Sequence, residues 1–218
     1  MRTIAVIALK GGSGKTTLAT HVALAAHLRG LKTLVADTDP QRSATEVLQA
    51  RGASGPEYVA TSGPGLFAAQ LAAVSSAVDL MVIDTAAGAV EDVGQAIVLA
   101  DLSLLVVRPT LLDIAAMVRT IDIVRRLGKE AVVVINQAPV ARDGVEPPVV
   151  RRALRALEFM RLAVAPTILR LRSIYQTGLE NGRSAEESLD VIAAKEVADL
   201  WAFIEPLAFG QRDNPPAL

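Results

Sequence analysis

Six short apolar runs, separated by longer segments of helical periodicity, constrain the fold of this chain more than any other feature. Several runs are continuously apolar, which is typical of strands buried on both faces. The alternation of strand and helix patterns predicts an α/β domain with a doubly wound, mostly parallel sheet. The predicted strands are 3–9, 32–37, 57–61, 79–84, 102–107 and 131–136. The predicted helices between and after them are 16–29, 43–51, 66–76, 91–100, 112–127 and 147–158.

The last third of the chain follows a less regular pattern. We expect a short strand near 163–168, then helices at about 174–181 and 185–206. The sequence shows no internal repeat and no linker, so we expect one domain over 1–209 and a flexible tail over 210–218. A chain of 218 residues is long enough to bury a full core.

The composition excludes several kinds of site. The chain contains no cysteine, which rules out disulfides, thiolate metal sites and iron–sulfur clusters. Its two histidines both lie in the first predicted helix, so a transition-metal site is not expected. The net charge of −1 indicates no particular partner. Because no apolar run reaches the ~20 residues of a membrane span and the N-terminus lacks signal-peptide features, we expect a cytoplasmic protein without a membrane partner.

A glycine-rich loop, KGGSGKTT at residues 10–17, directly follows the first apolar run. Glycines let the backbone turn tightly and direct its N–H groups at phosphate oxygens. The helix that follows presents its positive end to the same anion. The loop therefore predicts a nucleotide-phosphate site. Its predicted backbone contacts are Gly11, Gly12, Ser13 and Gly14.

Three side chains at the end of the loop suit the same chemistry. Lys15 is expected to bridge the β- and γ-phosphates of the nucleotide, and the Thr16 hydroxyl to coordinate Mg²⁺. Thr17 is expected to bond the α-phosphate region. The loop departs from the standard pattern G-x-x-x-x-G-K-[ST] because Leu9 stands in place of the early glycine. A second lysine, Lys10, precedes the glycines and has no role in the standard pattern.

Further polar side chains follow three other predicted strands. Since the carboxyl ends of parallel strands form the ligand-binding edge, these groups are expected to meet the loop. Asp84 is expected to organise the magnesium ion. Asp37 and Asp39 come after the second strand, where a cluster of helix N-caps is an alternative interpretation. Asn136 ends the sixth strand, and a purely structural role for it is an equal alternative.

Three segments together resemble the deviant Walker A ATPases, and among them the ParA partition ATPases. They are KGGSGKTT, then VADTDPQRSAT after the second strand and VIDTAAG after the fourth. Weaker resemblance continues through 100–117, 132–139 and 172–188. It implies a single-domain fold of the deviant P-loop NTPase type, without a helix-turn-helix domain. It also implies slow, Mg²⁺-dependent ATP hydrolysis that a partner protein stimulates.

The resemblance assigns roles that these residues can physically carry. In that family the signature lysine, here Lys10, reaches across an ATP-dependent homodimer to the partner's nucleotide and acts in catalysis with Lys15. Asp39 matches the residue that orients the attacking water, and Asn136 one that contacts adenine. Asp37 is expected to support the lysine or the magnesium shell. The chain has DTAAG where the family usually has DTPPG, which loosens the switch loop without removing Asp84.

Positive charge is concentrated late in the chain. Residues 151–183 contain seven arginines and two glutamates, whereas 184–205 contain six acidic residues and one lysine. The resemblance favours three of these arginines as non-specific DNA contacts, and a solvated helix face is the alternative for the group at 151–155. The favoured residues are Arg170, Arg172 and Arg183.

The function expected from these features is partition of plasmids or chromosomes, or positioning of an intracellular cargo. It would involve the nucleoid and a ParB-like or centromere-binding adaptor. Other members of the superfamily stay open as alternatives: a MinD-like ATPase, a regulatory ATPase of polysaccharide assembly, or a biosynthetic ligase. The C-terminal residues lack the basic amphipathic helix that membrane positioning requires.

Overall fold

The computed structural model describes residues 1–88 and 90–210, and its centre is a six-stranded sheet in the order β3-β2-β4-β1-β5-β6. All neighbouring strands are parallel, which confirms the predicted doubly wound sheet. The strands are β1 (Arg2–Ile7), β2 (Thr33–Asp37), β3 (Glu57–Ala60), β4 (Leu80–Asp84), β5 (Leu102–Val107) and β6 (Ala131–Ile135).

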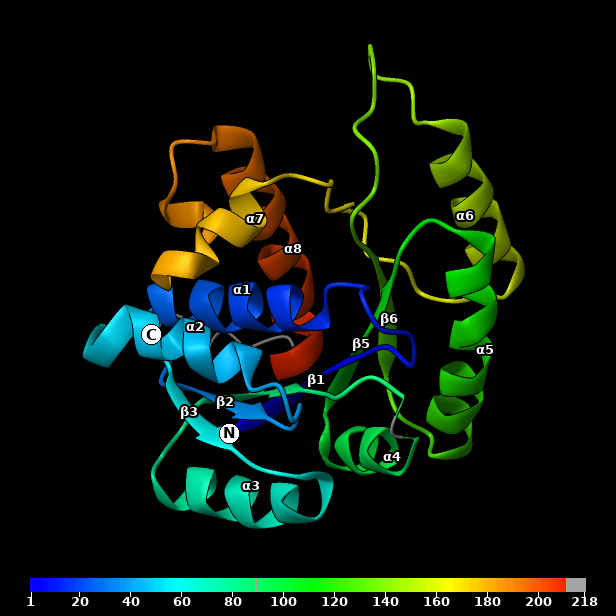
Figure 1. Cartoon of the computed structure of the whole chain (residues 1–218). Helices are drawn as coiled ribbons and strands as arrows, with labels where there is room; N and C mark the ends of the chain where they lie inside the picture. The colour runs from blue at the N-terminus through cyan, green and yellow to red at the C-terminus, as the bar shows by residue number, and fades with distance from the viewer. Residues whose placement is uncertain (89, 211–218) are drawn as a thin grey trace, which may run out of the picture.

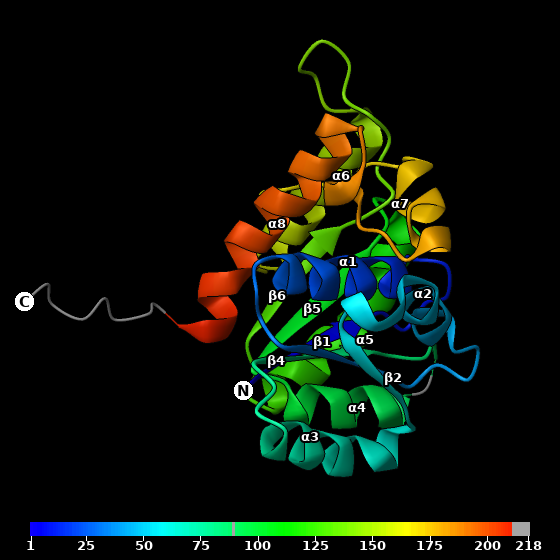
Figure 2. The same cartoon turned by 90° about the vertical axis from the view of Figure 1, so that its left-hand side faces the viewer.

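Helices cover both faces of the sheet (Figures 1 and 2). One face packs against α1 (Lys15–Leu28), α2 (Ser43–Arg51), α7 (Ile174–Thr177) and α8 (Val191–Phe209). The other face packs against α3 (Leu66–Ser75), α4 (Val90–Leu99), α5 (Leu111–Arg126) and α6 (Pro148–Phe159). Single 3₁₀ turns occur at Gly52–Ser54, Gly63–Gly65, Leu179–Asn181 and Ala185–Glu187. None of the helices in these described residues is long and apolar enough to cross a membrane.

The two cores explain why the strands read as continuous apolar runs. Along β1, Ile4 and Val6 belong to the core beneath α1 and α8, whereas Ala5 and Ile7 belong to the core beneath α4 and α5. Every residue of β2, β4 and β5 is likewise buried. A strand with helices on both faces has no solvent side, so the alternation of apolar and polar residues disappears.

The strand expected near 163–168 does not form. Only isolated parallel bridges join this segment to β6 and the loop after it. The amide of Ala165 donates to Val133, but the next bond to β6 comes from Leu169 to Ile135. A regular parallel ladder would continue with residue 167, so two residues loop out of the pairing. Pro166, which has no N–H to donate, lies in this interruption.

The C-terminal helices are interrupted where the pattern predicts continuous helices. The segment expected as one helix over 185–206 forms a 3₁₀ turn and then α8, which starts only at Val191. The carboxylate of Asp190 accepts bonds from the amides of Ile192 and Ala193, so it caps a new helix. Similarly, the helix expected over 174–181 is α7 followed by a 3₁₀ turn. The predicted flexible tail falls mainly on 211–218, outside the described residues.

His21 is buried in α1, and its ring meets the ring of Tyr175 edge-on, with 5.3 Å between centroids. Its Nδ1 lies 2.8 Å from the carbonyl oxygen of Thr17, so this nitrogen carries the proton. Nε2 has no partner among the described residues. Burial lowers the pKa of His21 to about 4, against a weaker opposing effect of the Thr17 carbonyl. Protonation of the imidazole therefore opposes folding.

We predict that His21 contributes to acid sensitivity. Because its pKa is lowered in the folded state, its effect on stability is absent above pH 6.5 and grows as the pH falls toward 4. The shift corresponds to up to about 3 kcal/mol of unfolding free energy. Urea unfolding at pH 7.5 and 4.5 should show a smaller loss in His21→Phe than in the wild type. An equal loss in both proteins would contradict the prediction.

Candidate nucleotide-binding site

The glycine-rich loop joins β1 to α1 at the carboxyl edge of the sheet. β1 ends at Ile7, two residues earlier than predicted, so Leu9 and Lys10 already belong to the loop. Gly14 has a φ of +86°, a left-handed conformation that favours glycine, and α1 begins immediately after it. The amide groups of the first turn, 15–17, donate to no acceptor within the described part of the chain. They are free to bind an anion.

Asn136 supports this loop from the end of β6. Its Nδ2 donates to the carbonyl oxygen of Ser13 at 2.9 Å, and its Oδ1 accepts from the amide of Gln137 at 2.9 Å. The side chain packs so closely against Gly14 that a Cβ there would collide with the Asn136 amide. The structure thus gives Asn136 a supporting role, and its contact with adenine stays a prediction.

Asp37 and Asp84 are direct neighbours in the sheet, because the ends of β2 and β4 pair in register. The carboxylate of Asp37 accepts bonds from the amide and hydroxyl of Thr45 at 3.0 and 2.9 Å. It also accepts from the amide of Asp39 at 3.1 Å. These bonds cap the start of α2, which favours the helix-capping interpretation of Asp37. Its role in the magnesium shell stays a prediction.

Asp84 has a different environment. Its side chain is fully buried, and neither oxygen has a hydrogen-bond partner among the described residues. Burial raises the pKa of Asp84 to about 7, and the charges of Asp37 and Asp39 add to this. The Thr16 hydroxyl and the Lys15 ammonium oppose the rise. Thr16 and Lys15 offset the cost of burying the Asp84 charge only in part, so binding of a further cation would stabilise this carboxylate.

The residues around Asp84 fit a magnesium ion that is held together with a nucleotide. No group of three histidine or acidic side chains in the described chain is arranged to hold a metal alone. Mg²⁺ usually combines one or two protein oxygens with phosphate oxygens and water. Asp84 and the Thr16 hydroxyl would supply the protein oxygens. When bound, the ion would neutralise charge that develops on the phosphates.

Lys15 lies beside these carboxylates and is only 6% exposed. Burial lowers the pKa of Lys15, whereas the charges of Asp84 and Asp39 raise it. Asp39 is half-buried, and its Oδ1 accepts from the amide of Gln41 at 2.9 Å. The structure therefore brings together the predicted phosphate cation, the predicted metal ligand and the carboxylate predicted to orient water.

Lys10 is held apart from this group by α5. Its Nζ lies 2.6 Å from Oδ1 of Asp113, a carboxylate that is nearly buried, while the Lys10 side chain is 41% exposed. Arg108, at the end of β5, also pairs with Asp113. Burial raises the pKa of Asp113, but hydrogen bonds from Arg108 and Lys10 outweigh it and hold the pKa below its ordinary value. Two cations thus share one carboxylate.

Sequence reasoning missed Arg108 and Asp113, although both lie in a segment that resembles the ParA family. Their position just after β5 could have identified them, since the residues that follow the carboxyl ends of the strands form the binding site in this kind of sheet. The helical pattern of 112–127 instead suggested an ordinary helix start. The side chain of Thr110 accepts from the amide of Asp113, so the segment is indeed a helix N-terminus as well.

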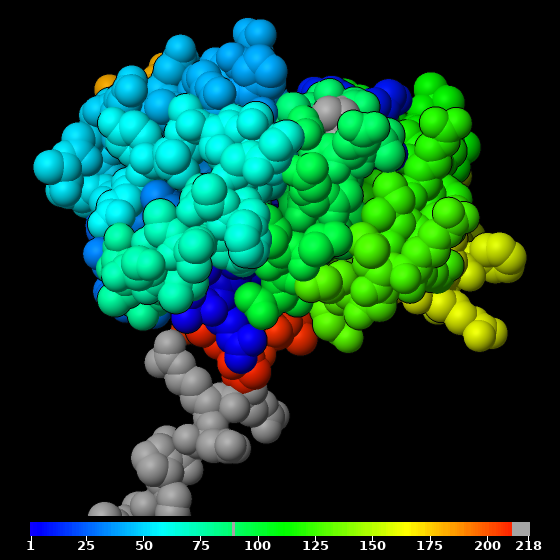
Figure 3. All heavy atoms as spheres, turned by 90° about the horizontal axis from the view of Figure 1, so that it is seen from below, coloured from blue at the N-terminus to red at the C-terminus, as the bar shows by residue number. Residues whose placement is uncertain are grey.

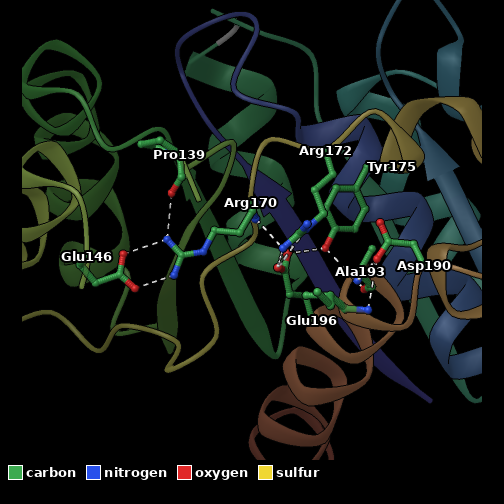
Figure 4. Close-up of polar contacts among 9 residues, drawn as sticks. Pro139, Glu146, Arg170, Arg172, Tyr175, Asp190, Ala193 and Glu196 are labelled. Atoms are coloured by element: carbon green, nitrogen blue, oxygen red, sulfur yellow. Dashed lines mark hydrogen bonds and ion pairs between the residues drawn. The ribbon is translucent and has the colours of Figure 1, made fainter. Parts of the chain in front are cut away.

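The arginines predicted to contact DNA are mostly engaged within the chain (Figure 4). Arg170 pairs with Glu146 through its two terminal guanidinium nitrogens, Nη1 and Nη2, at 2.8 and 2.5 Å. Arg172 pairs with Glu196, which also accepts from the hydroxyl of Tyr175 at 2.6 Å. Arg183 is exposed and has no ion-pair partner in the described chain. The structure does not present the three arginines as one free surface.

We predict that nucleotide binding depends on pH through Asp84. Its pKa of about 7 means that the carboxylate is mostly protonated at pH 6. The Mg²⁺-dependent part of ATP affinity should therefore fall about tenfold from pH 8 to pH 6. Calorimetric titration of ATP with Mg²⁺ measures this, and a parallel series in EDTA corrects for titration of ATP itself. Full Mg²⁺ enhancement in Asp84→Asn would contradict the assignment.

Comparison with solved structures places this site in a known fold. Apo McdA from Cyanothece superposes with a TM-score of 0.78 at 18% identity, covering 95% of this chain and 99% of that one. MinD from Pyrococcus horikoshii with Mg-ADP gives 0.75 at 17%, covering 95% and 97%. A putative plasmid partition protein from Borrelia burgdorferi bound to AMPPNP gives 0.68 at 16%, covering 94% and 98%.

The sequence itself matches a family model over residues 4–179, described as the CobQ/CobB/MinD/ParA nucleotide binding domain. No curated protein matches the sequence significantly. The solved structures above are too distant in sequence to show more than the fold. The family match spans most of the chain and includes the loop, both aspartate-bearing strand ends and Asn136. The protein therefore belongs to the CobQ/CobB/MinD/ParA family of nucleotide-binding domains.

Proposed function

We propose that this protein is a Mg²⁺-dependent ATPase that dimerises on binding ATP and, as a dimer, binds DNA without sequence preference. A ParB-like or centromere-binding adaptor would stimulate hydrolysis and release the protein from the nucleoid. This cycle would drive partition of DNA or positioning of a cargo. The observation that carries the proposal is the position of Lys10. This cation lies at the start of the phosphate loop, but it forms an ion pair with Asp113 on α5 and does not join the other charged groups of the site.

The contacts of Lys10 suit a residue that acts in trans. The loop already has a buried lysine for its own nucleotide, Lys15. Lys10 is far more exposed, and its only ion-pair partner in the described chain is Asp113. Release of Lys10 would not leave that buried carboxylate unpaired, because Arg108 stays bonded to it. The cost of extending Lys10 toward a partner's phosphates is therefore small.

The remaining site residues would carry the chemistry within each protomer. Lys15 and the amides of the first turn of α1 would bind the phosphates, and Asp39 would orient the water that attacks the γ-phosphate. The half-buried position of Asp39 allows it to reach both the site and solvent. Lys10 from the partner would stabilise charge on the transferred phosphoryl group, as an arginine finger does.

DNA binding is proposed to use arginines that are free in the monomer. Arg151, Arg152 and Arg155 lie within about one turn of α6, are exposed, and form no ion pair in the described chain. Arg183 is also exposed and forms no ion pair within 4 Å in the described chain, although its charge acts on nearby Glu187. A free guanidinium can bond a phosphate without first breaking an internal pair, so these residues are better suited than Arg170 and Arg172.

The proposed function is tested by measuring the affinity for DNA with ATP, with ADP and without nucleotide, each across a salt series. A duplex of random sequence, about four helical turns long, serves as the probe in fluorescence anisotropy. DNA binding is expected only with ATP, and its affinity should fall steeply with salt, because phosphate contacts release counterions. Equal retention in all three nucleotide states would refute the coupling of ATP to DNA binding.

We predict opposite effects on dimerisation for two variants of the lysine pair. Lys10→Ala should bind ATP as the wild type does but fail to form the ATP-dependent dimer. Asp113→Asn should dimerise at lower protein concentration, because Lys10 no longer has to leave an internal partner. Sedimentation velocity with a slowly hydrolysed ATP analogue measures both. A normal dimer in Lys10→Ala would contradict the trans role.

We predict that paired and free arginines respond differently to truncation. The triple variant Arg151→Ala, Arg152→Ala, Arg155→Ala should keep ATP-dependent dimerisation but reduce the salt slope of DNA binding by about 0.9 for each phosphate that the protein no longer neutralises. Arg183→Ala should act in the same direction. Arg172→Ala serves as the matched control and should lower the unfolding midpoint, because it leaves Glu196 without its cation. A larger DNA defect in Arg172→Ala than in the triple variant would instead favour Arg172 as a DNA contact.

A further inference from the structure

Helix α3 presents an uncharged apolar stripe to solvent. No charged residue occurs between Glu57 and Asp79. Within this stretch Phe67, Leu71 and Val74 are 66%, 59% and 55% exposed. Their spacing of four and three residues puts them on one side of the helix. Exposed apolar residues that gather on one side of a helix are candidates for an interaction site.

A groove runs between this helix and its neighbour α4, on the face seen in Figure 3. Its volume is about 550 Å³, and it is open to solvent. Phe67 lines one wall, and Val98, which is half exposed, lines the other. The side chain of Gln70 donates to the carbonyl of Leu99 at 3.2 Å and so ties the two helices together. The groove is therefore part of the fixed fold.

Gly94 lies in the groove, in the middle of α4. Glycine weakens a helix interior relative to alanine, so its presence there needs a reason. The fold supplies none, because Gly94 has no positive φ and nothing lies within 4 Å of a Cβ added to it. The missing side chain instead leaves room for a second chain to approach the helix closely. This observation is independent of the exposed stripe, of which Phe67 is the member that lines the same groove.

The charge beside the groove is acidic. Glu91 lines it, and Asp92 follows in the same first turn of α4. Neither α3 nor α4 contains a lysine or arginine. A ligand that fits this groove therefore combines an apolar ridge with positive charge at one end.

We propose that the α3/α4 groove binds an amphipathic helix of a partner protein, with an apolar ridge and basic residues at the end that meets Glu91 and Asp92. Two neighbouring helices form a channel that suits a third, and an amphipathic helix lays its apolar face into an apolar groove of this kind. A second copy of this chain is a poorer occupant, since it would bring Glu91 and Asp92 against the same acidic pair.

The groove lies next to the nucleotide site along the chain. α4 begins at Val90, two residues after Gly88, in the loop that leaves Asp84. A partner helix that packs on the first turn of α4 would therefore contact the helix that directly follows the Asp84 loop. The binding proposal itself does not rest on ATP hydrolysis or DNA binding, so it can be tested without nucleotide.

The probe is a synthetic helical peptide of about four turns with a fluorescent label, a single ridge of leucines and a pair of lysines at each end. A control peptide has the same composition with the leucines distributed around the helix. Fluorescence anisotropy against the full-length protein should show saturable binding of the ridge peptide and at least tenfold weaker binding of the control. Equal affinity of both peptides, or no binding of the ridge peptide below about 1 mM, would overturn the proposal.

Three variants of the protein locate the binding. Gly94→Leu fills the groove and should weaken the peptide at least tenfold, and Glu91→Lys should weaken it severalfold at low salt only. Gly94→Ala separates binding from folding: its unfolding midpoint should rise by roughly 2–4 °C while its affinity falls. Phe159→Ala, which removes an exposed aromatic from α6, is the matched control and should bind normally. Wild-type affinity for the peptide in Gly94→Leu would overturn the proposal. So would a wild-type dimer that forms without nucleotide and is abolished by Gly94→Leu, because a second copy of the chain would then occupy the groove.

Discussion

The nucleotide site depends on one close approach, in which the side chain of Asn136 packs against Gly14. The Asn136 amide holds the carbonyl of Ser13, and no Cβ fits between the two residues. This contact ties the phosphate loop, which follows β1, to the end of β6, on the other side of β5. The pairing of β2 and β4 brings Asp37 and Asp84 to the same edge of the sheet. The free amides of the first turn of α1, the buried Lys15 and the buried carboxylate of Asp84 then lie together at this edge. Each alone would be costly to bury, and together they fit an anion with its metal.

The two lysines of the loop have opposite environments although they are close in the sequence. Lys15 is buried beside Asp84, whereas Lys10 is exposed and bonded to Asp113 on α5. The left-handed turn at Gly14 redirects the chain between them. In the proposed trans role of Lys10, the ion pair with Asp113 would keep this cation away from the phosphates of its own protomer until a second protomer binds. Arg108 would make release of Lys10 reversible, because the Asp113 carboxylate would keep one partner when the other leaves.

Much of the fold and of the loop could be predicted because local patterns determine them. Doubly buried strands read as apolar runs, and the glycines of the loop identify a turn that leads into a helix. The features that sequence reasoning assigned wrongly depend on contacts distant in the sequence. Residues 163–168 have strand character, yet Pro166 and the spacing of Ala165 and Leu169 along β6 prevent a ladder. The ion pair of Arg170 with Glu146 also depends on distant contacts and has no local signal in the sequence, while the predicted contact of Arg170 with DNA stays a prediction.

The sequence by itself determined the order of strands and helices, the phosphate loop and the chemical types gathered at one edge of the sheet. It could do so because periodicity and glycine conformation act over a few residues. Only the tertiary structure decided which charges are paired and which are free. It assigned Arg108 and Lys10 to one carboxylate, used Arg172 to hold α8 through Glu196, and buried Asp84 beside Lys15 and Thr16. The physical reason is that the energy of a charge depends on its burial and its nearest neighbours, and these come from segments far apart along the chain.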